Sequence, residues 1–156
     1  QNWPGTAAVL LMGEEVLPVC SAALLKGGQR LTPAQVAELP LLQQSTRPDL
    51  WRLWFEAMGV QTPHWHSGPR YELFSMLATA AAHGLGVALI PRMLVEDDLL
   101  RGHLVVACDR PLHSSRGYYL VSPVLRDPPA ALAPFREWLV DRALAESGGA
   151  AASARG

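Results

Sequence analysis

Hydrophobic positions along the chain alternate between helical and strand-like spacing, which predicts helices and strands in regular succession. Thr32–Gln35 carries a threonine cap, a proline at the first helical position and a glutamine that completes a capping box. Apolar residues at helical spacing predict further helices from an Asp49 cap to Gly59 and over roughly Tyr71–His83. Val87–Ile90 is apolar on both faces, as in a strand covered by helices on either side.

Shorter patterns complete an alternating α/β arrangement without an internal repeat. Pro18 makes the strand around it an edge or crossing strand. A proline-rich start after an Asp127 cap predicts the last helix, and Gly-, Ala- and Ser-rich residues after Glu146 predict a mobile tail. We expect the other strands at Val16–Cys20, Leu39–Gln44, His64–Ser67, Leu104–Ala107 and Tyr118–Val121, with a short helix opened by Pro91.

Composition narrows the possible classes of protein. The chain has 156 residues, of which 49% are hydrophobic, enough for one domain or two small lobes with a sizeable core. A formal net charge of −1 gives no general attraction for phosphate backbones, so the chain is not expected to bind DNA itself. No apolar run approaches the ~18 residues that span a bilayer, and the first residues do not resemble a signal peptide, so we expect a cytoplasmic location.

Motifs for catalysis or metal binding are weak. Gly84–Gly86 follows a helix and opens a strand, the reverse of a dinucleotide-binding fingerprint, so these glycines are expected to cap the helix. His64 and His66 have chelating spacing but no evident third ligand, and Ser114 near His113 lacks a positioned acid. We therefore expect no enzyme activity, no metal and no cofactor.

Buried roles are expected for the cysteines and for one aromatic cluster. Cys20 and Cys108 lie in apolar, strand-like surroundings, which favours buried reduced thiols over a disulfide. Trp51, Trp54 and Phe55 share one short helix and are expected to form core or interface packing rather than a ligand cage.

Polar residues stand at three places where a strand leads into a helix: Ser45–Arg47, Arg70–Glu72 and Ile90–Arg92. Open α/β sheets bind ligands at the carboxyl ends of their strands, where helix N-termini present unpaired N–H groups. Hydroxyls and arginines there suit a carboxylate or another polar metabolite. The alternative is that Ser45 and Thr46 only cap the helix and the arginines are solvated, and spacing alone does not decide between the two.

The stretch Leu77–Val105 carries the most specific pattern. Its Ala-rich helix, Gly-Leu-Gly turn, Val-Ala-Leu-Ile-Pro strand, acidic helix and Arg-Gly-His-Leu-Val segment resemble the effector-binding domain of LysR-type transcriptional regulators. Trp51–Gly59 is similar to the family's Trp-x-x-Trp-Phe helix, and Leu31–Gln44 to its short helix ending in Leu-Pro-Leu-Leu. Further matches lie at Asn2–Gly5, Val16–Ser21, Tyr118–Val121 and Phe135–Leu139, so the resemblance covers nearly all of the chain up to about residue 146.

The resemblance implies a periplasmic-binding-protein-like (type 2) α/β regulatory domain, with one complete Rossmann-like lobe and the C-terminal part of the other. Residues 1–15 would be a remnant of the first lobe, 16–115 the second lobe, 116–146 the return strand and C-terminal helix of the first lobe, and 147–156 a disordered tail. The family implies a small-molecule effector between the lobes and an oligomer that contacts DNA only through an N-terminal helix-turn-helix absent from this chain.

Matching positions supply the effector-binding residues that the resemblance implies. Hydroxyls are expected to donate hydrogen bonds, Arg70 to pair with charge and Tyr71 to form an aromatic wall. Exposed edges of an incomplete first lobe are expected to drive pairing with another copy. A solute-binding protein of a transport system is the main alternative, and a fragment without ligand affinity is another. The implied effector-binding set is Ser45, Thr46, Arg70, Tyr71, Glu72, Val87 and Tyr118.

Overall fold

Two compact units make up the computed structural model of the chain, which describes residues 4–125 and 129–153, with side chains as far as residue 145. The central unit is Glu15–His113, and the terminal unit combines Gln1–Glu14 with Ser114–Gly156. The chain passes between the units along β1 (Thr6–Cys20) and β6 (Leu112–Pro123). The sequence had predicted lobe boundaries after residues 15 and 115.

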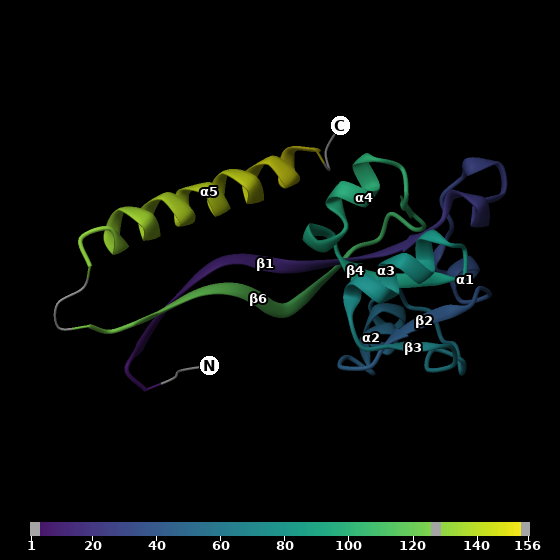
Figure 1. Cartoon of the computed structure of the whole chain (residues 1–156). Helices are drawn as coiled ribbons and strands as arrows, with labels where there is room; N and C mark the ends of the chain where they lie inside the picture. Colours follow the sequence, from purple (N-terminus) through teal and green to yellow (C-terminus); the bar gives the residue numbers. More distant parts are fainter. Residues whose placement is uncertain (1–3, 126–128, 154–156) are drawn as a thin grey trace. The chain divides into compact units, whose positions relative to one another are not determined.

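The central unit contains a mixed sheet with strand order β3-β2-β4-β1-β5 (Figure 1). Its strands β2, β3 and β4 are parallel, whereas β1 is antiparallel to both β4 and β5. The strands other than β1 are β2 (Leu41–Gln44), β3 (Arg70–Tyr71), β4 (Val87–Pro91) and β5 (Val105–Val106). The helices are η1 (Ala22–Leu24), η2 (Lys26–Gly28), α1 (Pro33–Val36), α2 (Leu50–Ala57), α3 (Phe74–Ala82), η3 (Arg92–Leu94) and α4 (Glu96–Leu100).

Both faces of this sheet are buried, as the apolar sequence of β4 predicted. Val87 and Leu89 belong to the core cluster that includes residues of α2, while Ala88 and Ile90 belong to the cluster that includes residues of α3. Side chains alternate between the two faces of a strand, so this division places α2 and α3 on opposite sides of the sheet. The central unit is therefore a layered α/β fold with helices on both faces of its sheet.

Pro18 occupies an interior strand, where the sequence had predicted an edge or crossing strand. It pairs with Leu89 of β4, and its carbonyl accepts a hydrogen bond from Ala107 N–H at 2.9 Å on the β5 side. In an antiparallel ladder the N–H and C=O of one residue point the same way. Because proline has no N–H, Pro18 cannot donate a hydrogen bond to the Ala107 carbonyl. Leu31 N–H donates to the Ala107 carbonyl instead, which makes the proline compatible with an interior position.

Several local signals are confirmed. Thr32 and Gln35 form the reciprocal capping box with Pro33 in the first turn of α1. Gly84 follows α3 with a φ of +76°, a left-handed conformation that glycine adopts without steric cost, so it ends the helix as predicted.

Other local predictions are wrong. His64–Ser67 forms turns rather than a strand, and Asp49 makes no capping hydrogen bond because its carboxylate pairs with Arg52 Nε at 3.3 Å. The helix expected over Tyr71–His83 begins only at Phe74.

The terminal unit pairs the first part of β1 with β6, and both strands can be followed in Figure 1. Val124 N–H donates to the Gly5 carbonyl at 2.8 Å, and Ser114 Oγ donates to Glu14 Oε1 at 2.8 Å, which indicates an antiparallel pair. The unit ends in α5 (Leu132–Ser153), which continues past residue 147, where the sequence had predicted a disordered tail. The predicted Asp127 cap lies outside the described residues. Across the described parts of the chain, no helix combines the length and apolarity needed to cross a bilayer.

Candidate functional site

Three parallel strands of the central unit end at one edge of the sheet. β2 ends at Gln44, β3 at Tyr71 and β4 at Pro91, and Gln44 is paired with Tyr71. The carboxyl edge of an open α/β sheet is where such folds commonly bind ligands. We call the residues that form or follow the ends of β2 and β3 the polar edge: Ser45, Thr46, Arg70, Tyr71 and Glu72.

Hydrogen bonds join the two segments of the polar edge. Ser45 N–H donates to the Tyr71 carbonyl at 2.9 Å. The amide of Gln44 donates through Nε2 to the Glu72 carbonyl at 2.7 Å, and its Oε1 accepts from Thr46 N–H at 2.6 Å and from Thr46 Oγ1 at 2.8 Å. The structure therefore brings four of the predicted site residues together: Ser45, Thr46, Tyr71 and Glu72.

Arg70 and Tyr71 form strand β3 and do not open helix α3 as the sequence had predicted. Arg70 pairs in register with Gln43, whose N–H donates to the Pro69 carbonyl at 2.9 Å. Successive side chains of a strand face opposite sides. Tyr71 accordingly packs against the core cluster beside α3, while Arg70 is exposed.

The arginines near this edge have different surroundings. The Arg47 guanidinium lies 5.0 Å from the centre of the Phe74 ring, a cation–π contact. Arg92 Nε lies 2.9 Å from Glu15 Oε1, in a half-buried ion pair. Arg70 is exposed on the edge strand, whereas the Arg92 guanidinium is already paired with a carboxylate.

The backbone N–H groups of Ser45, Thr46 and Arg47, in the loop after β2, have acceptors within the protein. Besides the bonds of Ser45 and Thr46, Arg47 N–H donates to the Gln44 carbonyl at 3.0 Å and Leu50 N–H to the Arg47 carbonyl at 3.1 Å. The sequence had predicted unpaired N–H groups at this helix start, and these bonds remove the N–H groups of the loop and of Leu50 from that set. An anion cannot be bound here by these amides without breaking internal hydrogen bonds.

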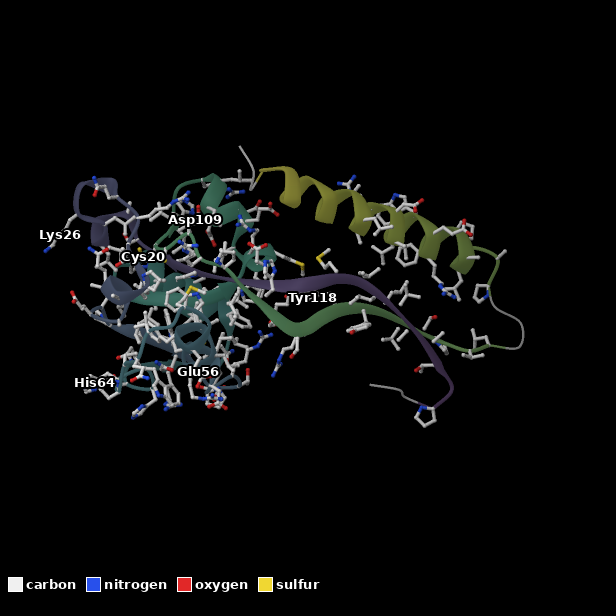
Figure 2. The ribbon with its side chains drawn as sticks, turned by 180° about the vertical axis from the view of Figure 1, so that it is seen from behind. Cys20, Lys26, Glu56, His64, Asp109 and Tyr118 are labelled. Atoms are coloured by element: carbon white, nitrogen blue, oxygen red, sulfur yellow. The ribbon has the colours of Figure 1, made fainter. Side chains whose placement is uncertain are left out.

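Two further predicted site residues lie outside the segments that form the polar edge. Val87 is completely buried and pairs with Leu41, the first residue of β2, so it lies at the opposite end of the parallel strands. Tyr118 lies half-buried on β6, in the terminal unit (Figure 2).

A shallow groove follows the exposed side of α3. Its volume is about 550 Å³ and its surface is mostly apolar, with Met76 and Leu85 each about half exposed. The sequence did not predict this groove, nor the buried position of Gln44. Two glutamines at the end of an apolar strand were a signal that could have indicated buried polar side chains there. The groove is lined by Tyr71, Ser75, Met76, Thr79, Ala80, His83 and Leu85.

The other candidate groups for chemistry do not form a site. His64, labelled in Figure 2, and His66 lie in turns. Among the residues that the structure describes, no three His, Cys, Asp or Glu side chains are grouped to bind a metal ion. Cys20 and Cys108 are free and buried, as predicted. Burial raises the pKa of the Cys20 thiol to about 11 and also raises the pKa of Cys108, so both thiols are unreactive near neutral pH.

The tryptophans of α2 form core packing, as predicted. Trp51 and Trp54 meet edge to face with ring centres 5.7 Å apart, and Trp51 stacks on Phe55 at 5.5 Å. Each indole N–H has a partner, because Trp51 donates to the Leu42 carbonyl at 2.9 Å and Trp54 to the Arg110 carbonyl at 2.8 Å. No polar group of this cluster is left for a ligand.

Comparison with solved structures places this fold among regulatory domains. The effector domain of the transcriptional regulator AmpR of Pseudomonas aeruginosa matches with a TM-score of 0.74 and 28% identity, over 95% of this chain and 69% of that chain. The AmpR effector binding domain of Citrobacter freundii matches with a TM-score of 0.73 and 27% identity, over 91% of this chain and 70% of that chain. The predicted periplasmic-binding-protein-like fold is confirmed.

Sequence relatives agree. The glycine cleavage system transcriptional activator of Escherichia coli K12 is 34% identical over 93% of this chain and 48% of its own length, and the transcriptional activator AmpR of Rhodobacter capsulatus is 33% identical over 88% of this chain and 46% of its own. The chain thus spans about half the length of the curated relatives it matches. These relatives are transcriptional regulators, so the transport alternative is not favoured. Residues 1–144 match the LysR substrate binding domain, and the chain belongs to that family.

Proposed function

We propose that this chain senses a small polar metabolite and thereby controls transcription as part of a LysR-type regulator. The metabolite binds at the polar edge, where Ser45 and Thr46 offer hydroxyl groups, Arg70 a positive charge and Glu72 a negative charge. The observation that carries the proposal is the joining of these two segments by Gln44 and by the Ser45–Tyr71 hydrogen bond. Neither Val87 nor Tyr118 is needed for it.

DNA recognition in this proposal belongs to a helix-turn-helix outside these 156 residues. A net charge of −1 supports this division, because a DNA-binding module is expected to be basic. The domain acts without catalysis, metal or cofactor, in the cytoplasm, where LysR-type regulators meet their promoters.

A thermal-shift screen of metabolites on this chain tests the effector site. A metabolite present at a hundred times its Kd stabilises a folded domain by about 2.7 kcal/mol, which corresponds to a rise in Tm of roughly 5–10 °C. Ser45→Ala, Thr46→Val and Arg70→Ala each remove one polar group from an exposed position. We expect each variant to weaken the Kd of the best metabolite about tenfold, the loss of one charge-assisted or neutral hydrogen bond.

Matched controls come from exposed positions that are not part of the polar edge. Ser115→Ala on β6 and Arg101→Ala after α4 remove the same chemical groups and should leave the Kd unchanged. The proposal fails if all three edge variants bind the metabolite as tightly as these controls do.

We also propose that copies of the chain associate with one another. The terminal unit exposes several large apolar side chains, among them Leu10 at 53%, Tyr119 at 56% and Trp138 at 58% of their surface. Phe135 and Trp138 lie next to one another on α5, with ring centres 6.0 Å apart. Exposed apolar surface of this kind favours association. Light scattering should show a mass that rises with concentration and falls for Trp138→Ser, whereas a constant monomer mass at high concentration contradicts the proposal.

A further inference from the structure

Gln44 is a buried polar side chain in the strand that leads into the polar edge. Only 5% of its surface is exposed, and all of β2 is buried with it. A buried amide is expected to use its hydrogen-bonding groups, because each one left unpaired is costly. The side chain of Gln44 does so by reaching both segments of the polar edge.

The orientation of this amide is fixed by its partners. The Glu72 carbonyl can only accept a hydrogen bond, so the atom 2.7 Å from it must be the Nε2 donor. Thr46 N–H can only donate, so the atom 2.6 Å from it must be the Oε1 acceptor. The reversed amide would face oxygen with oxygen and N–H with N–H, and two independent backbone groups exclude it.

This orientation determines what Thr46 can offer a ligand. Oε1 is an acceptor, so the Thr46 hydroxyl, 2.8 Å away, must be the donor in that contact. Its N–H hydrogen is bound to the same oxygen. Thr46 therefore has no hydrogen left to donate, and only the lone pairs of Oγ1 face outward from an exposed position.

The surroundings agree with an acceptor role. The neighbouring backbone N–H groups of Ser45 and Arg47 donate to the carbonyls of Tyr71 and Gln44, so the N–H groups on either side of Thr46 are not available to an anion. The exposed carboxylate of Glu72 lies on the segment that Gln44 binds. A group with N–H hydrogens is favoured at Thr46, and a carboxylate is not.

We propose that Gln44 is a positioning residue that makes Thr46 a hydrogen-bond acceptor, and that the effector presents a protonated amine or an amide N–H to Thr46 Oγ1. The inference rests on the effector site proposed above and narrows its ligand to molecules with a nitrogen donor. It reverses, at Thr46, the donor role that the family resemblance had implied. Ser45 keeps an exposed hydroxyl that can donate or accept.

Three small probes separate the two halves of such a ligand: L-alanine, propionate, which lacks the amine, and ethylammonium, which lacks the carboxylate. Each is titrated into the ¹⁵N-labelled chain while the amide resonances of Ser45, Thr46 and Glu72 are followed. We expect alanine and ethylammonium to shift these resonances at about tenfold lower concentration than propionate, the discrimination given by one charge-assisted hydrogen bond.

Variants test the mechanism of that preference. Thr46 is exposed, so Thr46→Val should fold normally and lose the preference, and Thr46→Ser should keep it. Gln44→Met frees the Thr46 hydroxyl hydrogen, and propionate should then bind nearly as well as ethylammonium. Gln43→Met is the matched control, because Gln43 is equally buried but donates to the Leu41, Trp65 and Ser67 carbonyls and not to the edge.

The outcomes distinguish this inference from the proposed function. If the edge resonances respond to propionate as strongly as to ethylammonium, the acceptor role is wrong while the effector site stands. The acceptor role is also wrong if the Thr46→Val variant prefers ethylammonium over propionate as strongly as the wild type does. If no probe shifts the edge resonances, both the site and the acceptor role are overturned.

Discussion

Replacing Gly86 with alanine tests the packing between β4 and β2. A Cβ at Gly86 would lie 2.3 Å from the Pro40 carbonyl oxygen and 3.1 Å from Leu42 Cδ2, so the backbone of one strand must move. The same carbonyl accepts the hydrogen bond of Val87 N–H at 2.9 Å, and this bond would be lost or stretched. Overpacking costs about 1–3 kcal/mol and the hydrogen bond about 1 kcal/mol, which gives a destabilisation of about 3 kcal/mol.

Thermal unfolding followed by tryptophan fluorescence measures this effect, because Trp51 and Trp54 are buried in the central unit. A loss of about 3 kcal/mol corresponds to a fall in Tm of roughly 6–12 °C for a domain of this size. Gly13→Ala is the matched control: neither Gly13, in β1, nor Gly86, just before β4, has a positive φ, and a Cβ added at Gly13 would meet no atom within 4 Å. The reasoning is refuted if Gly86→Ala unfolds within about 2 °C of wild type, a small part of the expected shift, or if Gly13→Ala falls equally far.

The core and the first helix give three further predictions. Trp51→Phe should lower the free energy of unfolding by about 2 kcal/mol, because the Leu42 carbonyl loses its buried hydrogen-bond donor. An unchanged midpoint of chemical unfolding contradicts this. Cys20 and Cys108 should resist iodoacetamide at pH 8 until denaturant is added, because burial raises the pKa of both thiols, and rapid labelling of the native chain would count against this. For Cys20 the stabilising effect should be complete below about pH 9 and decline as pH rises toward about 11. Thr32→Ala should lower stability by about 1 kcal/mol through loss of the capping box, measured by urea unfolding, and Thr32→Ser should restore it.

The sequence predicted correctly those elements whose structure depends on residues adjacent in sequence. The capping box at Thr32–Gln35 and the apolar run Val87–Ile90 depend on residues that are adjacent in sequence, and both predictions are confirmed. The order of elements and the family resemblance followed from the same kind of pattern. The position of the exposed hydroxyl residues Ser45 and Thr46 after β2 was predictable for this reason.

Hydrogen bonds between segments distant in sequence determine the features that the sequence did not predict. Arg70 and Tyr71 form a two-residue strand because Gln43, Gln44 and Ser45 supply its hydrogen bonds, and nothing in their own neighbourhood distinguishes that strand from the first turn of α3. Pro18 is accommodated only because Leu31, far along the chain, provides the missing donor. The orientation of the Gln44 amide, and with it the role of Thr46, likewise depends on a carbonyl at Glu72.

The central claim is that the effector binds at the polar edge of the central unit. A crystal structure of this chain with the metabolite that gives the largest thermal shift tests it most directly. The account predicts ligand density in contact with Thr46 Oγ1, Ser45 and the Arg70–Glu72 segment. Ligand density that contacts neither Ser45 nor Thr46, for example along the groove beside α3, would contradict it.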